Sequence, residues 1–373
     1  MQPVSEPAGQ RVSDDKLRVL IAGGGTGGHV IPALAIAREL RDRHGAEVRF
    51  VGTARGLETR LVPDAGFKLE LVRSGQLKNV SLATRLRTAI DLPLGAVECV
   101  RILQQFRPQV VVGVGGYASG PGMLAAILLR VPMLVFEPNA VPGLANRLVG
   151  RWVSAAAVNF EQTRSYFRNA RVTGIPVRAE FFAIAPKTLG PLRLLVFGGS
   201  QGARVLNQAM PKIAARLLKR FGELEILHQT GARHAEVTAK AYEQACVPGG
   251  RVTVQPYLDD MPAEFAASDL ILCRSGASTM AELGAAGKAS LLVPFALAAD
   301  DHQRRNAEVF RDAGAAKMLT ETGLAEPERL LDELTTLLAD PDGLRAMGER
   351  ARALARPDAV REIAAMVARL ARI

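Results

Sequence analysis

Cysteine, tryptophan and long apolar runs are all scarce in this chain, and each shortage excludes a class of protein. The three cysteines are scattered without a CxxC pair, which excludes a disulfide framework or a structural zinc site and favours a reducing compartment. The single tryptophan leaves little for stacking on single-stranded nucleic acid. No uncharged apolar run approaches about 18 residues, so no membrane span is expected. The polar residues 1–16 are predicted to be a flexible tail and not a signal peptide.

The length and the charge distribution predict two domains with different surroundings. A chain of 373 residues is too long for one ordinary core. Residues 1–175 hold 22 lysines and arginines against 13 acidic residues, whereas residues 176–373 hold 25 against 24. A basic first half favours an anionic partner, either nucleic acid or an anionic membrane surface, although surface charge also serves solubility alone.

Two glycine-rich turns, one in each half, are the most informative feature. Residues 23–28 (Gly-Gly-Gly-Thr-Gly-Gly) follow the apolar run 17–22, and residues 198–203 (Gly-Gly-Ser-Gln-Gly-Ala) follow the apolar run 192–197. Each turn precedes an alanine- and leucine-rich helical pattern. A strand, a glycine turn and a helix together place backbone N–H groups against an anion. We therefore expect two nucleotide-type domains with a substrate between them.

Short apolar runs alternate with helical patterns along the whole chain. Continuous runs such as residues 110–112 are typical of parallel strands buried on both faces, so each half is predicted to be a doubly wound α/β sheet. We place the domain junction near Gly174–Arg178 and a last helix at residues 359–372. The expected strands are 17–22, 48–52, 110–114, 133–136 and 156–159 in the first half, and 192–197, 224–229, 252–255, 270–273 and 290–293 in the second.

The first glycine turn permits two kinds of chemistry. It fits the GxGxxG pattern of a dinucleotide site, but no acidic residue follows the second strand, where only Arg55 is placed to receive a 2′-phosphate. A nicotinamide-dependent oxidoreductase therefore stays open. His29 ends the turn at a helix N-terminus, which disfavours the imidazolium. His29 is accordingly either a neutral proton acceptor or a residue that caps the turn.

Polar residues also follow predicted strands in the second half. Ser200 and Gln201, in the second turn, suit a pyrophosphate without a metal. Glu282, about two turns into a predicted helix, can accept from both hydroxyls of a ribose. His302 and Gln303 suit sugar hydroxyls. The alternatives are a surface glutamate for Glu282, and a helix start capped by Asp300 or Asp301 for His302 and Gln303.

Two further strand ends in the first half are polar and rich in glycine. Residues 115–121 and 137–143 should converge on the first glycine turn if the sheet is doubly wound, and Asn139 can hydrogen-bond a sugar. The nearby stretch 78–107 mixes apolar and basic side chains. It predicts either a membrane-surface patch or an ordinary packed helix.

Together these motifs make the chain similar to the MurG family of peripheral membrane glycosyltransferases. The similar segments are 23–29, 115–121, 197–207, 257–261, 274–282 and 300–307, spread over nearly the whole chain. The resemblance implies an α/β fold of GT-B type, with two Rossmann-like, doubly wound parallel-sheet domains facing a cleft. It also implies an inverting transfer of N-acetylglucosamine from UDP-N-acetylglucosamine to the 4-hydroxyl of the muramic acid in lipid I, the undecaprenyl-pyrophosphoryl-N-acetylmuramyl-pentapeptide. The product would be lipid II for peptidoglycan synthesis.

The resemblance further implies the domain roles and the site residues. Residues 17–175, with the last helix 357–373 packing back, would take the acceptor and face the membrane, and residues 176–356 would bind the donor. His29 is the candidate catalytic base, and Glu282 would anchor the ribose. The donor would contact Thr26, Gly27, Gly28, Asn139, Arg178, Ser200, Gln201, Leu258, Glu282, His302 and Gln303. The acceptor would contact Gly25, Thr26, His29, Gly116, Tyr117, Ser119 and Gly120.

The implied partners are UDP-N-acetylglucosamine, lipid I, the anionic cytoplasmic face of the inner membrane and other cell-wall synthesis proteins. No nucleic acid, cofactor or metal is implied. The chain departs from the family pattern at Ile175, where the family usually has asparagine, and at Pro138, where it usually has glutamine. An epimerase of UDP-N-acetylglucosamine with the same fold stays open, as does a non-catalytic protein that binds a nucleotide sugar or a lipid pyrophosphate.

Overall fold

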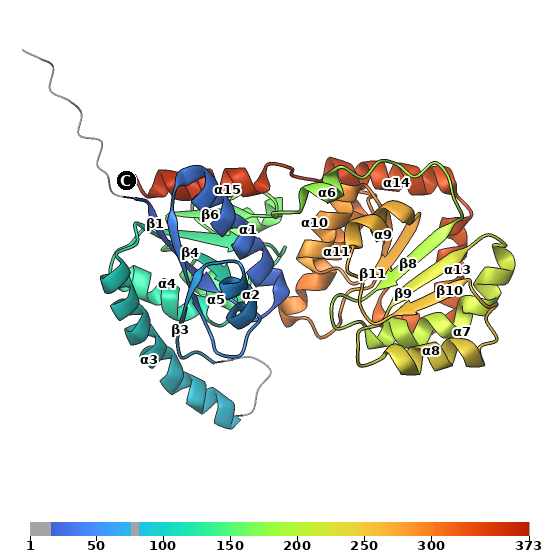
Figure 1. Cartoon of the computed structure of the whole chain (residues 1–373), viewed down its shortest axis with the longest axis horizontal. Coiled ribbons are helices and arrows are strands. Elements are labelled where there is room, and N and C mark those ends of the chain that lie inside the picture. Colours follow the sequence, from blue (N-terminus) through green and yellow to red (C-terminus); the bar gives the residue numbers. More distant parts are fainter. Residues whose placement is uncertain (1–15, 76–81, 373) are drawn as a thin grey trace, which may run out of the picture.

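Two open parallel sheets form the framework of the structure (Figure 1). The computed structural model describes residues 16–75 and 82–372, without the side chains of residues 82–90. The strand order in the first sheet is β3 (Lys68–Leu71), β2 (Glu47–Gly52), β1 (Arg18–Gly23), β4 (Val110–Gly115), β5 (Met133–Glu137), β6 (Ala155–Val158) and β7 (Ala170–Val172). In the second sheet it is β10 (Val252–Gln255), β9 (Glu225–Gln229), β8 (Arg193–Phe197), β11 (Leu270–Cys273), β12 (Ala289–Leu292) and β13 (Lys317–Met318). The order reverses beside β1 and beside β8, which confirms the two doubly wound, Rossmann-like domains of a GT-B fold.

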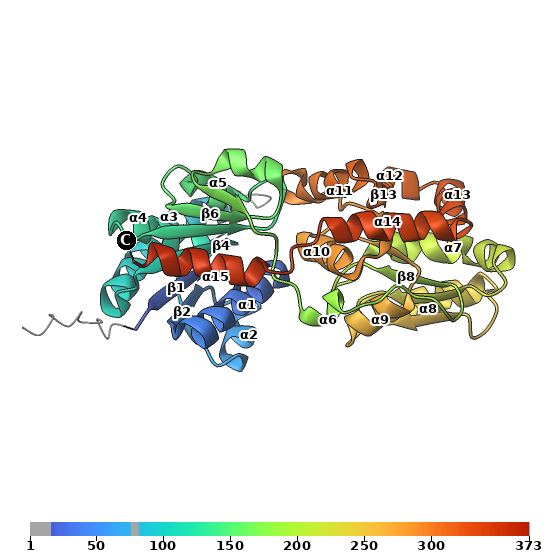
Figure 2. The ribbon, with the colours of Figure 1, turned by 90° about the horizontal axis from the view of Figure 1, so that it is seen from above.

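Helices cover both faces of each sheet (Figures 1 and 2). The first domain has α1 (Gly27–His44), α2 (Glu58–Asp64), α3 (Leu82–Phe106), α4 (Ser119–Leu128), α5 (Leu144–Val149) and the 3₁₀ turn η1 (Glu161–Tyr166). The second half of the chain has α6 (Ala179–Phe182), α7 (Arg204–Arg220), α8 (Ala235–Gln244), α9 (Met261–Ala267), α10 (Ala277–Ala286), the 3₁₀ turn η2 (Ala299–Asp301), α11 (His302–Asp312), α12 (Glu321–Leu324), α13 (Pro327–Leu338), α14 (Pro341–Ala353) and α15 (Ala359–Leu370).

Both faces of β1 are buried, which explains its uninterrupted apolar sequence. Val19 and Ile21 belong to a core shared with α1 and α15, whereas Leu20 and Ala22 belong to a core shared with α3 and α4. Successive strand residues point to opposite faces, so a strand between two helical layers needs apolar residues at every position. Full burial of a valine, leucine or isoleucine side chain in such a strand contributes about 1.5–3 kcal/mol. Strand β8 divides its residues between two cores in the same way.

The chain crosses between the domains twice. The first crossing runs from β7 to α6, and the second runs from α14 to α15. Figure 2 shows α14 and α15 lying nearly end to end across the two domains. The apolar residues Ile363, Val367 and Leu370 recur on one face of α15 and pack in the core of the first domain. The two crossings touch, because a Cβ on Gly174 would lie 2.5 Å from Cβ of Arg356.

Every strand expected from the sequence is present, with ends within one residue of the expected positions. Strands β3, β7 and β13 were not expected, and all three lie at the edges of their sheets. They are short, and an edge strand needs no continuous apolar run. The expected tail lies outside the described residues except for residue 16. Residues 78–81 of the mixed apolar and basic stretch lie outside them as well.

Candidate active site

The first glycine turn packs directly against the end of β4. The N–H group of Gly24 donates to the Gly115 carbonyl at 3.3 Å. Any side chain on Gly116, whose φ is +78°, would collide with the Gly24 carbonyl. These two strand ends therefore meet, as the doubly wound topology predicts. Only glycine allows the two backbones to approach so closely.

The turn leads into α1 and leaves its N-terminus open. The Thr26 carbonyl accepts from the N–H groups of His29 and Val30, but the exposed Thr26 side chain makes no capping hydrogen bond. Gly27 and Gly28 occupy the first helical positions. A helix N-terminus without a side-chain cap presents backbone donors to an anion. The turn is thus shaped for a phosphate, the chemistry expected from its sequence.

A buried carboxylate that the sequence analysis missed holds this turn. Glu58 is 1% exposed and accepts from the N–H of Gly25 at 2.7 Å, the N–H of Thr53 at 2.9 Å and the hydroxyl of Thr53 at 3.0 Å. A side chain on Gly24 or Gly56 would collide with it. Glu58 therefore fixes the path of the turn from behind. In the sequence it stands at an ordinary helix start, so only the third dimension reveals its role.

His29 lies half-buried in the first turn of α1. Its Nδ1 atom is buried and has no hydrogen-bond partner within the described part of the chain. Burial lowers the pKa of His29, the Val114 carbonyl partly opposes this, and His302 of the second domain lowers the pKa further. The imidazole is therefore neutral near pH 7. The charge of His302 thus acts on His29 across the domain interface.

The other expected acceptor residues divide into exposed and buried positions. Tyr117 is 46% exposed, its carbonyl accepts from the Ser74 hydroxyl at 2.6 Å, and the space around Gly120 is open. Ser119, in contrast, is fully buried, and its hydroxyl has no partner among the described residues. The Ser119 side chain thus lies beneath the surface that an acceptor can reach.

Glu137, at the end of β5, is a second buried carboxylate that the sequence analysis did not single out. It is 2% exposed and accepts from the N–H and the side-chain amide of Asn139, the N–H of Gly143 and the side-chain amide of Asn146, at 3.0–3.2 Å. Burial raises the pKa of Glu137, and these donors oppose the rise. Pro138, one of the two departures from the family pattern, uses its carbonyl to accept from Asn159.

Asn139 connects this loop to the second domain. Its Oδ1 atom accepts from the amide of Asn306 at 3.3 Å, and the Oδ1 atom of Asn306 accepts from the N–H of Ala140 at 2.9 Å. Asn306 also donates to the Ser275 carbonyl at 3.2 Å, and it is fully buried. Asn306 therefore ties α11 to the loop after β5 and to the loop after β11. Ile175, the other departure, is buried in the core of the first domain.

The second glycine turn joins β8 to α7. Ser200 and Gln201 are exposed there, and the N–H of Gly202 donates to the Gly199 carbonyl at 2.8 Å. Both glycines have positive φ, and a side chain on Gly202 would collide with the Thr230 carbonyl. The turn presents Ser200 and Gln201 above an uncapped helix N-terminus, an arrangement suited to a pyrophosphate.

A buried polar network that the sequence analysis missed lies below this turn. Asn207 donates to the Thr230 carbonyl at 2.9 Å, and His228 bonds to Asn207 at 3.1 Å and to the Tyr242 hydroxyl at 2.8 Å. Burial lowers the pKa of His228 to about 3, so it is neutral. The network supports the same carbonyl against which Gly202 packs.

Glu282 lies in α10, the helix that follows the strand-end loop beside the second glycine turn. No group among the described residues donates a hydrogen bond to its carboxylate. Burial raises the pKa of Glu282 to about 7, and the nearby Arg178 lowers it. Arg178 is exposed, with its guanidinium 5.2 Å from the ring centre of Phe181. A carboxylate without a protein partner, next to a cation, suits a ribose diol and a phosphate.

His302 and Gln303 begin α11. The Nδ1 atom of His302 donates to the Ala299 carbonyl at 2.7 Å, and the side-chain oxygen of Gln303 accepts from the N–H of Phe295 at 3.0 Å. Asp301 has φ of +55° and makes no side-chain cap, so the expected capping role does not hold for it. Leu258 packs its side chain in the second-domain core, which leaves only its backbone for contact with a ligand.

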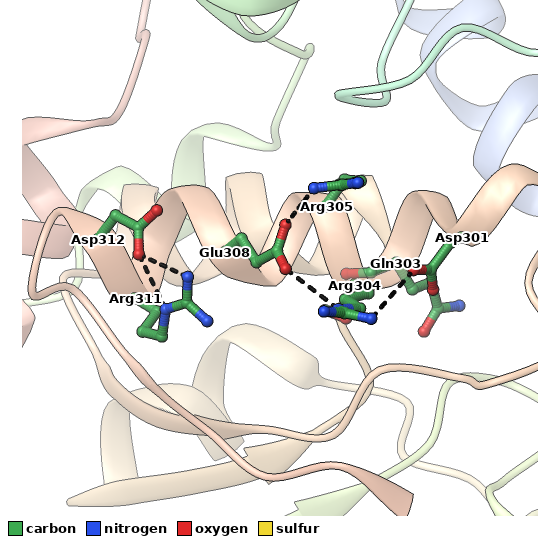
Figure 3. Close-up of polar contacts among 8 residues, drawn as sticks. Asp301, Gln303, Arg304, Arg305, Glu308, Arg311 and Asp312 are labelled. Carbon is green, nitrogen blue, oxygen red and sulfur yellow. Dashed lines mark hydrogen bonds and ion pairs between the residues drawn. The ribbon is translucent and has the colours of Figure 1, made fainter.

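The outer face of α11 carries ordinary surface ion pairs (Figure 3). Glu308 pairs with Arg304 at 3.1 Å and with Arg305 at 3.0 Å, and Asp301 lies 3.8 Å from Arg304. Such exposed pairs contribute about 0–1 kcal/mol each. Within the described chain, no group of histidine, cysteine and acidic side chains can hold a metal ion. None of the described helices is long and apolar enough to cross a membrane.

Comparison with known proteins identifies relatives over nearly the full length. Residues 19–158 match the glycosyltransferase family 28 N-terminal domain, and residues 193–363 match the corresponding C-terminal domain. The UDP-N-acetylglucosamine–N-acetylmuramyl-(pentapeptide) pyrophosphoryl-undecaprenol N-acetylglucosamine transferase of Solibacter usitatus is 45% identical, over 95% of this chain and 96% of the relative. The crystal structure of Acinetobacter baumannii MurG has a TM-score of 0.79 at 32% identity, covering 95% of this chain and 99% of that one.

A UDP-N-acetylglucosamine 2-epimerase from Neisseria meningitidis, solved with UDP-N-acetylglucosamine bound, has a TM-score of 0.65 at 14% identity over 95% of this chain and all of that chain. At this identity the likeness shows the fold alone. The match at 45% identity over 95% of this chain shows the family as well. The chain therefore belongs to glycosyltransferase family 28 and, within it, to the MurG family of N-acetylglucosamine transferases.

Proposed function

We propose that this chain transfers N-acetylglucosamine from UDP-N-acetylglucosamine to the 4-hydroxyl of the muramic acid in lipid I, with inversion, and so forms lipid II. The name of its relative with 45% identity supports the reaction. The observation in the structure that carries the donor assignment is the Glu282 carboxylate, which has Arg178 beside it and no hydrogen bond within the described residues. A ribose would supply the missing donors, and Ser200, Gln201 and the α7 N-terminus would receive the diphosphate.

The chemical step requires a base on the acceptor side and stabilisation of the leaving group on the donor side. His29 is the proposed base, because burial lowers its pKa and because the charge of His302 in the second domain acts on it. As the acceptor hydroxyl attacks the anomeric carbon, its proton passes to His29, the bond to the diphosphate breaks, and UDP leaves toward the second glycine turn. Backbone donors and Arg178 would stabilise the developing charge.

We further propose that the enzyme acts as a peripheral protein on the anionic cytoplasmic face of the membrane. Leu94 and Val97 of α3 and Leu124 and Leu128 of α4 are 40–64% exposed, and the two helices pack together. Arg101 lies two turns beyond Leu94 on the same face of α3. Exposed apolar side chains with basic neighbours suit a bilayer surface with anionic lipids.

The test is UDP release from UDP-N-acetylglucosamine, with and without a lipid I analogue, against UDP-N-acetylgalactosamine as the control donor. Release that depends on the acceptor and on the first donor supports the transferase. Release without acceptor would replace it with an epimerase or a hydrolase. Donor binding without release under any condition would leave a non-catalytic binding protein.

A further inference from the structure

Gln303, near the start of α11, is held at both its backbone and its side chain. Its backbone carbonyl accepts from the Ser275 hydroxyl at 2.8 Å, and its Oε1 atom accepts from the N–H of Phe295 at 3.0 Å. An N–H can only donate, so the atom that faces it is the amide oxygen. Within the described residues, the side-chain NH2 group of Gln303 has no acceptor. This partly buried side chain can therefore still donate to a ligand.

Phe295 belongs to the loop between β12 and η2, and the guanidinium of Arg274 holds the start of this loop. Nη1 of Arg274 donates to the carbonyls of Val293 and Pro294, at 3.1 Å each. Its Cζ atom lies 5.2 Å from the centre of the Phe295 ring, a distance at which a cation and an aromatic face attract each other. Because the N–H that holds Gln303 belongs to Phe295, Arg274 acts on Gln303 through this loop.

Glu321, the first residue of α12, anchors Arg274. Nη2 of Arg274 lies 2.6 Å from Oε1 of Glu321, and the two side chains are only 12% and 21% exposed. Solvent and salt screen such an ion pair less than a surface pair. The guanidinium is planar and presents its donors in a fixed fork. Holding Nη2 against Glu321 therefore also fixes the direction in which Nη1 meets the loop.

An arginine beside the proposed nucleotide site has one alternative role, which is direct contact with the diphosphate. The surroundings of Arg274 disfavour this role, because its charge is paired with Glu321 and its Nη1 atom is committed to two carbonyls. Arg178, in contrast, is exposed and is the better candidate for the diphosphate. The geometry thus favours a positioning role for Arg274.

We propose that Arg274, anchored by Glu321, is a positioning residue for the donor sugar: it fixes the loop 293–295, so that the Phe295 N–H holds Oε1 of Gln303 and the Gln303 NH2 group donates to a hydroxyl of the transferred sugar. The inference rests on the proposed function and on the contact between Gln303 and the donor sugar that the family resemblance implies. UDP alone lacks this sugar. Loss of Arg274 therefore weakens binding of the nucleotide sugar and leaves UDP unaffected, whereas loss of a diphosphate ligand would weaken both.

The test compares the Kd for UDP-N-acetylglucosamine with the Kd for UDP by calorimetric titration. The main variant combines Arg274→Met with Glu321→Gln, which removes both charges and so leaves no buried charge without a partner. Its Kd for the nucleotide sugar should rise at least about fivefold, the equivalent of one hydrogen bond lost to the sugar, while its Kd for UDP stays within about twofold. Gln303→Ala should have the same effect. Added to the main variant, Gln303→Ala should weaken binding no further, because both changes break the same contact.

The matched control combines Arg193→Met with Glu264→Gln. This ion pair has a distance of 2.9 Å, and its side chains are 24% and 26% exposed. Arg193 begins β8, at the end of the strand opposite to the second glycine turn. Neither Kd should therefore change in the control.

The side-chain amide signal of Gln303 in nitrogen NMR, assigned with Gln303→Ala, tests the wild type directly. It should shift with UDP-N-acetylglucosamine beyond any shift caused by UDP, and identical spectra with the two ligands would overturn the proposal. Arg274→Lys keeps the charge but lacks the fork, so it replaces the main variant if that variant fails to fold. Arg274→Lys should move the Gln303 signal of the free protein, and an unmoved signal would overturn the proposal.

Two results with the main variant would also overturn the proposal. One is equal weakening of UDP and UDP-N-acetylglucosamine, which would make Arg274 a ligand of the diphosphate. The other is an unchanged Kd for both ligands. A wild type that binds UDP-N-acetylglucosamine but releases no UDP with the acceptor would instead refute the proposed function and leave these binding measurements valid.

Discussion

Replacing Glu282 with glutamine should weaken donor binding by a predictable factor. The carboxylate has no hydrogen bond within the described residues, and we propose that it accepts from both ribose hydroxyls. Hydrogen bonds to a charged group contribute about 1.5–3 kcal/mol each. Glutamine keeps one acceptor oxygen, so roughly one such bond is lost, and the Kd for UDP should rise about 10- to 150-fold.

The pH dependence gives a second, independent measure of the same interaction. With a pKa of about 7, Glu282 is mostly protonated at pH 6 and mostly ionised at pH 8. Ribose hydroxyls bind the ionised form, so affinity for UDP-N-acetylglucosamine should rise about tenfold from pH 6 to pH 8. The variant Glu282→Gln should show no such rise. The nucleotide sugar is the right ligand here, because its diphosphate does not titrate in this range.

The stability of the free protein should change in the opposite direction. Folding raises the pKa of Glu282 from 4.5 to about 7, so the folded chain binds the proton more tightly than the unfolded chain does. This contribution is present in full below about pH 4.5 and is lost as the pH rises to 7. Glu282→Gln has no such loss, so at pH 8 it should melt at a higher temperature than the wild type while it binds UDP more weakly.

Calorimetric titration measures the affinity for the donor, and thermal melts measure stability, both at pH 6 and pH 8. The control is Glu236→Gln on the exposed surface of α8, which also removes one negative charge. A 2′,3′-dideoxy analogue of UDP should bind wild type and Glu282→Gln almost equally. If the variant still discriminates between UDP and the dideoxy analogue as strongly as the wild type, Glu282 does not contact the ribose.

Three further changes test other parts of the site. Gly202→Ala forces a side chain against the Thr230 carbonyl at a positive φ. It should lower the free energy of unfolding by at least about 1–2 kcal/mol and the affinity for UDP at least about tenfold. Gly222→Ala, in open space, should change neither quantity in urea melts and UDP titrations. Asn306→Ala leaves the buried Ala140 N–H without its partner and should cost about 1–3 kcal/mol in a urea melt; an unchanged midpoint would refute its bridging role. The pair Leu94→Asp and Leu128→Asp should reduce co-sedimentation with anionic vesicles at least about tenfold and leave turnover of a water-soluble acceptor intact; equal binding by wild type and variant would place the membrane contact elsewhere.

The sequence was sufficient for the elements that carry a local signal. Continuous apolar runs located the central strands because both faces of each sheet are covered, and glycine clusters located the turns because their φ values and close contacts admit only glycine. The short edge strands β3, β7 and β13 lack such a signal, because each contains a charged residue and none of their residues is buried.

The residues that hold the site could not be predicted in the same way. Glu58 and Glu137 look like surface glutamates in the sequence, and their burial follows from chain segments that meet only in the folded state. Asn306 lies within a recognised motif, but its bridge to Ala140 spans 166 residues. Sequence patterns thus pointed to the groups that we propose to meet a ligand, and missed the groups that hold those in place.

The double crossing between the domains constrains how they can move. A single connecting peptide would let one domain twist about the other in several directions. Two crossings that touch at Gly174 and Arg356 join the domains at one place by two chain segments. Bending of the domains about that place should therefore be easier than twisting of one domain against the other. Opening and closing then follow one coordinate, and a donor that draws the domains together would at the same moment bring His302 toward His29. Cutting the chain between α14 and α15 should release this constraint without removing any residue of the proposed site.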